Sequence, residues 1–148
     1  MMKSHLVLTI MILVCAALLF GSAAYVQYMV TIRNEANVSA IGVELFSDPD
    51  ATQKLTLLDW GTMEVGTSKT TTIYAKNVET LDVTLSFSVS NWAPENMSTF
   101  AGLSWSYSNE VIVPTQVLPI NFTLAISQYV TGVRNFSFDI TITATSTP

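Results

Sequence analysis

A long apolar stretch near the start of the chain constrains its fold and location more than any other feature. Residues 6–30 contain no charged side chain, and Gln27 is the only strongly polar residue among them. A helix rises about 1.5 Å per residue, so Leu6–Ala24 would span about 28 Å of the roughly 30 Å hydrocarbon core of a membrane. We therefore expect this stretch to enter or cross a membrane and the remainder of the chain to be exported.

The apolar stretch fits two interpretations, and the sequence leaves both open. As an uncleaved anchor, residues 1–24 form one helix that holds the following domain at the cell membrane. As a secretory signal, the stretch ends at small residues and is cut after Ala23 or Ala24, which releases a secreted protein or a surface-filament subunit. In both cases Lys3 before the stretch and the acidic sequence after it predict a cytoplasmic N-terminus and an extracellular domain.

Residues 25–148 are long enough for one domain with a single core. The chain has six basic and eleven acidic side chains, which argues against nucleic acid as a partner, because phosphate binding needs clustered Lys and Arg. The only histidine, His5, and the only cysteine, Cys15, both precede this domain. The domain therefore lacks the residues for Ser-His-Asp or Cys-His catalysis and for common zinc sites. We expect no enzymatic activity, no metal and no cofactor.

Apolar and polar residues alternate along most of residues 25–148, which is the pattern of half-buried antiparallel strands. Turn-forming residues interrupt the pattern at 48–50, 61–66, 91–94, 114 and 132. Seven to nine short strands predict an all-β fold, namely an immunoglobulin-like antiparallel sandwich of two sheets after the N-terminal helix, with a closed barrel as the alternative. The predicted strands cover residues 25–33, 40–46, 54–58, 69–76, 83–90, 103–108, 120–127 and 136–145.

Several blocks of the sequence resemble a family of small exported immunoglobulin-like domains of archaeal type. The segment from Trp60 to Lys69, followed by residues 73–77, resembles the family's "W-G-x-x-x-P-G-x-S-K … Y-x-K-N" stretch, and residues 90–94, 103–105 and 132–140 resemble its later blocks. The chain departs from this pattern at Val65 and Thr115, where the family usually has a Pro and a Gly in turns. The resemblance covers roughly residues 41–143, implies the fold, and brings no assigned activity with it.

Two kinds of candidate site stand out in the predicted domain. Four Asn-x-Ser/Thr sequons are candidate glycosylation sites, two on polar strand faces and two in predicted loops, so that all four are expected to be exposed: Asn37, Asn96, Asn121 and Asn135. Asp48 and Asp50, with Asp59 as a further ligand, supply oxygens suited to calcium, and the competing interpretation is a β-turn with acidic corners.

The tryptophans and the edges of the predicted sheets bear on partners. Trp60 and Trp92 lie near predicted turns, where such residues can stack on sugars but more often cover the open ends of a sandwich core, and Trp105 lies within a predicted strand. The polar strand faces are rich in Ser and Thr, and few charges protect the strands at residues 25–33 and 136–145. This predicts self-association through the first strand or through another sheet edge.

The sequence as a whole favours a membrane-attached cell-envelope glycoprotein with a structural or adhesive role based on protein–protein contacts. One alternative is a subunit of an extracellular filament or pilus, assembled by strand exchange after signal removal. A second alternative is an envelope accessory subunit that binds a surface layer, as the stator proteins of archaeal swimming filaments do.

Overall fold

The computed structural model describes residues 31–147. The predicted membrane or signal helix at residues 1–24, the candidate cleavage sites Ala23 and Ala24, and most of the predicted strand 25–33 lie outside the described residues. Within residues 31–147, no helix has the length and hydrophobicity that a membrane crossing requires.

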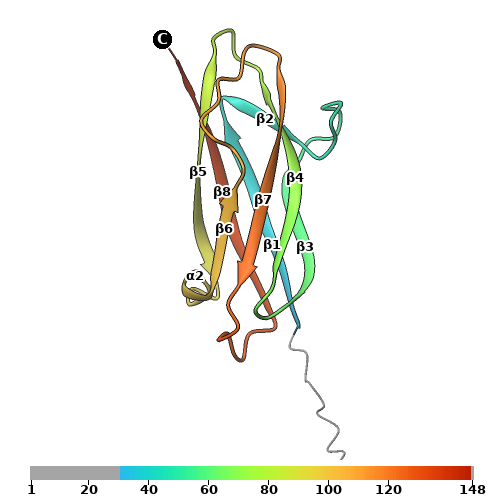
Figure 1. Cartoon of the computed structure of the whole chain (residues 1–148), viewed down its shortest axis with the longest axis vertical. Helices are drawn as coiled ribbons and strands as arrows, with labels where there is room; N and C mark the ends of the chain where they lie inside the picture. Colours follow the sequence, from blue (N-terminus) through green and yellow to red (C-terminus); the bar gives the residue numbers. More distant parts are fainter. Residues whose placement is uncertain (1–30, 148) are drawn as a thin grey trace, which may run out of the picture.

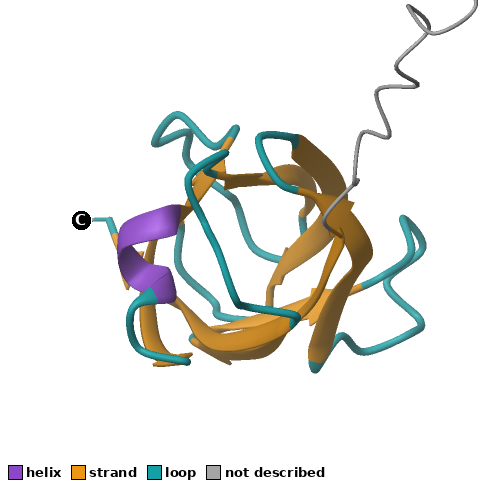
Figure 2. Ribbon diagram, turned by 90° about the horizontal axis from the view of Figure 1, so that it is seen from below, coloured by secondary structure: helices purple, strands orange, loops and turns teal. Residues whose placement is uncertain are grey.

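The described chain folds into two four-stranded sheets packed face to face (Figure 1). One sheet has the strand order β3-β1-β8-β5, here called the first sheet, and the second sheet has the order β2-β4-β7-β6. A short helix, α2, lies at one end of the molecule beside the end of β5 (Figures 1 and 2). The elements are β1 (Thr31–Ile41), β2 (Val43–Phe46), β3 (Leu57–Glu64), β4 (Ser68–Asn77), β5 (Val83–Ala93), α2 (Met97–Phe100), β6 (Ala101–Trp105), β7 (Val117–Ile126) and β8 (Asn135–Ser146).

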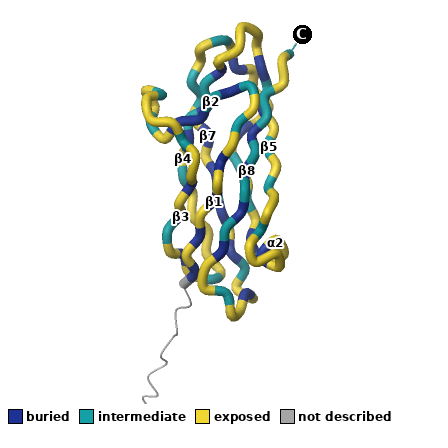
Figure 3. The backbone as a smooth tube through the Cα atoms, turned by 180° about the vertical axis from the view of Figure 1, so that it is seen from behind, coloured by how far each residue is buried: buried dark blue, intermediate teal, exposed yellow. Residues whose placement is uncertain are grey.

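The core lies between the two sheets, where the apolar side chains of alternate strand residues meet. In β7 and β8 the even-numbered apolar residues from 120 to 126 and from 136 to 142 are all buried, while their neighbours are exposed or half-buried. Figure 3 shows the resulting alternation of buried and exposed positions along the strands. The predicted all-β fold with two sheets is confirmed, and its eight described strands agree with the predicted number.

One strand pairing differs from the antiparallel arrangement that the sequence predicted. β1 and β8 run parallel, with Arg33 opposite Asn135 and Ile41 opposite Thr143. All other ladders between the described strands are antiparallel. Alternation along one strand gives no information on the direction of its neighbour, so the sequence could not reveal this pair.

The predicted strand 40–46 is in fact divided between the two sheets. β1 ends at Ile41 in the first sheet, and β2 begins at Val43 in the second. Gly42 between them has a φ of +77°, and a Cβ added there would lie 3.1 Å from the Cβ of Ala144. A residue without a side chain thus permits both the left-handed backbone and the close approach of β8.

The predicted turn at residues 61–66 is also wrong in its extent, because β3 continues to Glu64. Gly61, with a φ of +67°, lies within β3 at an irregularity in its pairing with β1, where Asn34 is opposite Gly61 and Glu35 is opposite Asp59. The extra residue is Trp60, so the segment is a β-bulge inside a strand. Bulge glycines and turn glycines look alike in sequence. The strand predicted at residues 54–58 corresponds to β3, which begins later than expected, at Leu57.

The last predicted strand, β8, is an interior strand and not a free edge, and so is β1, which contains residues 31–33 of the first predicted strand; residues 25–30 of that strand lie outside the described residues. β1 lies between β3 and β8, and β8 lies between β1 and β5. The uncharged residues of β8 need no protection, because β8 is paired with β1 on one side and with β5 on the other. The edge strands of the two sheets are β3 and β5 in the first and β2 and β6 in the second.

Thr115 adopts a backbone conformation that suits glycine. Its φ is +67°, it follows Pro114, and the N–H of Gln116 donates to the carbonyl of Val113 at 3.1 Å. Proline at the second position and a positive φ at the third are the features of a type II turn, which favours glycine at the third position. The chain therefore holds a β-branched residue where the backbone is strained.

Candidate functional site

Three polar residues from three strands meet on the outer face of the first sheet. Asn37 of β1 lies directly opposite Asp139 of β8 in their parallel ladder. On the other side of β8, Ser90 of β5 is opposite Asp139, and the next residue, Asn91, has a φ of +54° at the irregularity between Ser90 and Ala93. Asn91 was predicted to lie in a turn, and instead this bulge within β5 turns its side chain toward Asp139. We call Asn37, Asn91 and Asp139 the Asp139 cluster.

The carboxylate at the centre of the Asp139 cluster is held by an amide on each side. Asn91 Nδ2 donates to Asp139 Oδ2 at 2.7 Å, and Asn37 Nδ2 donates to Asp139 Oδ1 at 3.1 Å. These hydrogen bonds favour the charged carboxylate and hold the pKa of Asp139 below its ordinary value, with Asn91 making the larger contribution and partial desolvation opposing both. The cluster ties β1, β8 and β5 together on the solvent side of the sheet.

The hollow over the cluster is polar and open, and Asp139 is the only charged residue that lines it, although Glu35 is exposed two residues before Asn37 on β1. Ser39 and Thr141 share a hydrogen bond of 3.3 Å one step further along the β1–β8 ladder. An open hollow of about 290 Å³ lies over these residues, with Val38 and Ser90 completing its lining. Its amides, hydroxyls and one carboxylate can exchange hydrogen bonds with polar groups of a partner. Among the described residues, no three or more His, Cys, Asp or Glu side chains are placed to hold a metal ion.

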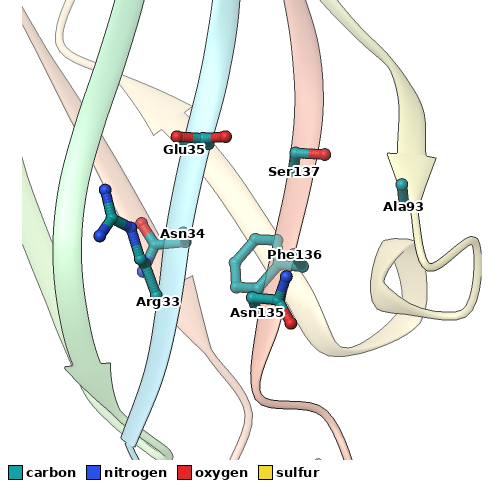
Figure 4. Close-up of a pocket in the computed structure, with 7 residues that line it drawn as sticks. All are labelled: Arg33, Asn34, Glu35, Ala93, Asn135, Phe136 and Ser137. Atoms are coloured by element: carbon teal, nitrogen blue, oxygen red, sulfur yellow. The ribbon is translucent and has the colours of Figure 1, made fainter.

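A second hollow, of about 260 Å³, lies nearer the beginning of β1 on the same sheet. Figure 4 shows its lining residues on β1 and β8, with Ala93 at the end of β5 beside them. One of them, Asn34, is completely buried, and its Oδ1 has no hydrogen-bond partner. The Nε1 of Trp60, which lies in the bulge opposite this part of β1, is likewise buried without a partner. The full lining is Arg33, Asn34, Glu35, Ala93, Asn135, Phe136 and Ser137.

All four sequon asparagines are exposed, as the sequence predicted. Asn135 begins β8, Asn121 lies on the outer side of β7, and Asn96 precedes α2. Asn37 is not in a loop as predicted, because β1 extends through it to Ile41. The alternation of apolar and polar residues along β1 was concealed in the sequence, because small residues surround Asn37. The face that carries the Asp139 cluster therefore also carries two of the four sequons.

Two of the three acidic residues considered for calcium, Asp48 and Asp59, have hydrogen-bond partners, and the third, Asp50, is exposed. Asp48 closes its own loop by accepting bonds from the backbone of Gln53 at 2.6 Å and from both the backbone and the hydroxyl of Thr52. Desolvation alone would raise the pKa of Asp48, but these hydrogen bonds outweigh it and lower the pKa below its ordinary value. Asp59 lies on β3, where it accepts a bond from the N–H of Gly61 at 2.6 Å. The hydrogen bonds of Asp48 match the alternative interpretation, a turn with acidic corners.

The three tryptophans are buried or half-buried, and their rings pack against aromatic residues of the core. Trp60 is completely buried and its ring lies 5.8 Å from that of Phe138, so it lies within the core and not at an open end. Trp92 stacks on Phe138 at 4.4 Å and is half-buried at the end of β5. Trp105, the last residue of β6, is half-buried and contacts Phe87 of β5.

Sequence reasoning missed the Asp139 cluster, although one signal was present. Asp139 is the only charged residue in the predicted strand 136–145, where all other outward positions are Ser or Thr. Its partners came from residues about 50 and 100 positions away, and only the strand order brings them together. No protein-family model matches the chain, and comparison with curated proteins gives no significant sequence match.

Proposed function

We propose that the chain is a non-enzymatic cell-envelope protein whose β domain acts outside the cell as a structural or adhesive protein-interaction module. In this proposal the two sheets form an immunoglobulin-like sandwich of the small exported type that the sequence resembles. Residues 1–24 either anchor the domain at the cell membrane or are removed after Ala23 or Ala24 during export.

The observation that carries the proposal is the flat polar face around the Asp139 cluster. Its side chains are fixed by hydrogen bonds to one another across three strands, and the hollow above them is shallow. A preorganised, open and polar face suits contact with another macromolecule, whereas small-molecule sites are usually concave and enclosed. The lack of His and Cys beyond residue 15 agrees with a role in binding.

Two measurements on the full chain in its native cells test this proposal. A tag after Pro148 should be cut by protease added to intact cells, because the domain is expected to lie outside. A photo-crosslinking residue at Ser39, beside the cluster, should yield adducts with an envelope protein, and one at Thr72 on the outer side of β4 serves as the control. A tag protected until lysis would contradict the proposal, and so would equal adducts at both positions.

Intact mass of the native protein separates the two forms of the proposal. A mass that begins at residue 24 or 25 supports a secreted protein, and a mass that retains Met1 or Met2 supports the membrane anchor. A filament subunit is the second candidate, since one edge strand, β5, carries no charge over its whole length. Because β1 and β8 are interior, strand exchange in such a filament must use β5 or another of the four edges.

A further inference from the structure

We infer that a second copy of this chain binds along the free edge of β5, so that two first sheets join into one continuous eight-stranded sheet. The inference names the partner and the surface for the interaction role proposed above, and it rests on that role. Four observations carry it: the lack of charge on β5, the position of its unpaired backbone groups, an incompletely covered apolar seam beside it, and the symmetry of its sequence.

β5 is the least protected of the four edge strands. β2 has only four residues and carries Glu44, which pairs with Lys54 at 2.6 Å. β3 carries two acidic residues and a bulge, and β6 has only five residues. β5 has eleven residues, its bulge at Asn91 lies near its end, and no charged residue occurs from Val83 to Pro94. Proteins normally protect such an edge with charges, so an uncharged long edge indicates a place where another strand pairs.

The hydrogen bonds of β5 locate the open part of its edge. On the side away from β8, Val83 exchanges two backbone hydrogen bonds with Ile112, and the N–H of Leu85 donates to the hydroxyl of Tyr107 at 2.9 Å. Alternate residues of a strand direct their backbone groups to the same side, so those of Phe87 and Val89 also point away from β8. Within residues 31–147, no hydrogen bond reaches the backbone of these two residues on that side.

An apolar seam follows the same open edge. Phe87 and Val89 are only half-buried, as are Leu103 and Trp105 on the neighbouring edge of the second sheet. The rings of Phe87 and Trp105 lie 4.6 Å apart, so this seam closes by side-chain contact without a ladder between β5 and β6. A strand added at β5 would cover the seam with its own apolar side chains and bury more of these rings.

The sequence of the open stretch fits an antiparallel copy of itself. A two-fold axis at Ser88 places Phe87 opposite Val89 of the second copy, and each such pair exchanges both of its backbone hydrogen bonds. The outward serines of both copies then align on the solvent face, where Ser86, Ser88 and Ser90 are exposed. The two Asp139 clusters become parts of one face. Because this contact is isologous, it closes as a dimer and does not propagate.

Disulfide trapping tests the pairing on the full chain in vesicles, with Cys15→Ser removing the native thiol. With Ser88→Cys, the axis brings two identical positions to a Cα separation of about 4.5 Å, which a disulfide can bridge. Ser86→Cys alone should not cross-link, because its symmetric copies lie too far apart. Mixing Ser86→Cys with Ser90→Cys chains should restore cross-linking, since these two positions face each other across the axis.

A charge variant and a remote control complete the experiment. Adding Ser88→Lys to the Ser86→Cys and Ser90→Cys mixture should reduce the cross-linked fraction several-fold, because two like charges then meet at the axis. Thr72→Cys on β4 measures random collision. Folded Ser88→Cys protein that cross-links no more than Ser86→Cys or Thr72→Cys alone overturns the inference. That result leaves the extracellular interaction role intact if the Pro148 tag is still exposed on cells, so the two proposals fail separately.

Discussion

Asn91 of β5 donates a hydrogen bond of 2.7 Å to the carboxylate of Asp139 of β8, and this contact exists because Asn91 occupies a bulge with a positive φ. The contact links an edge strand to the interior strand beside it on the solvent face. It also places a carboxylate between two amides, because Asn37 approaches from the opposite side. This relationship leads to the first of four predictions.

The pH dependence of unfolding should report on Asp139. Its pKa is lowered in the folded protein by the bonds from Asn91 and Asn37, so the folded state binds the proton less readily than the unfolded state. The stabilisation is therefore present above the ordinary carboxyl pKa and is lost as the pH falls through the lower, folded value. We expect thermal melts to show a smaller loss of stability on acidification below about pH 4 for Asp139→Asn than for the unchanged chain. Identical pH profiles for the two proteins would contradict this prediction.

Thr115→Gly should stabilise the fold. The φ of +67° strains a β-branched residue, and glycine relieves this strain at the cost of greater freedom in the unfolded chain, for a net gain of about 0.5–1 kcal/mol. Asn109→Gly is the matched control, because Asn109 has a φ of +64° and asparagine tolerates that conformation. Denaturant titration should show a higher midpoint for the first variant and little change for the second. A loss of stability in Thr115→Gly would show that the threonine side chain makes a compensating contact.

Two fully buried asparagines should respond in opposite ways to leucine. Asn34 leaves Oδ1 without a partner, so Asn34→Leu should raise the free energy of unfolding by about 1 kcal/mol. Asn77 donates to the carbonyls of Leu81 and Ile112 and accepts from the N–H of Glu79 at 2.8 Å, so Asn77→Leu should lower it by about 2–4 kcal/mol. Equal destabilisation of both variants in urea titrations would mean that Asn34 has a polar partner in solution.

Glycan occupancy should differ between Asn37 and two of the other sequons, Asn96 and Asn135. Asn96 precedes α2 and Asn135 begins β8, and neither amide nitrogen forms a hydrogen bond within the described residues. Asn37 already uses Nδ2, the atom to which a glycan attaches, in its bond to Asp139 within a paired strand. If the native cell glycosylates exported proteins, Asn96→Gln and Asn135→Gln should each lower the intact mass by one glycan, whereas Asn37→Gln should not. A glycan found on Asn37 would indicate attachment before β1 pairs.

Local features of the fold could be predicted because they depend on neighbouring residues. The alternation from Phe136 to Ala144 identified both the strand and its buried face, and the predicted strand 69–76 differs from β4 by one residue at each end. Strand boundaries were predicted wrongly near two glycines, because the sequence does not show which backbone role a glycine has. Gly42 divides one apparent strand between two sheets, and Gly61 lies in a bulge and not in a turn.

The sequence by itself thus determined the all-β class, the buried face of strands such as β5, β7 and β8, the exposure of the sequons and the absence of His and Cys beyond residue 15. Only the tertiary structure decided that β1 and β8 are parallel interior strands, that β5 is an edge strand among the described residues, and that Asp139 lies between Asn37 and Asn91. The physical reason is the range of the interactions. A side chain's face follows from the period of its own strand, whereas strand neighbours are chosen by pairing between segments up to about a hundred residues apart.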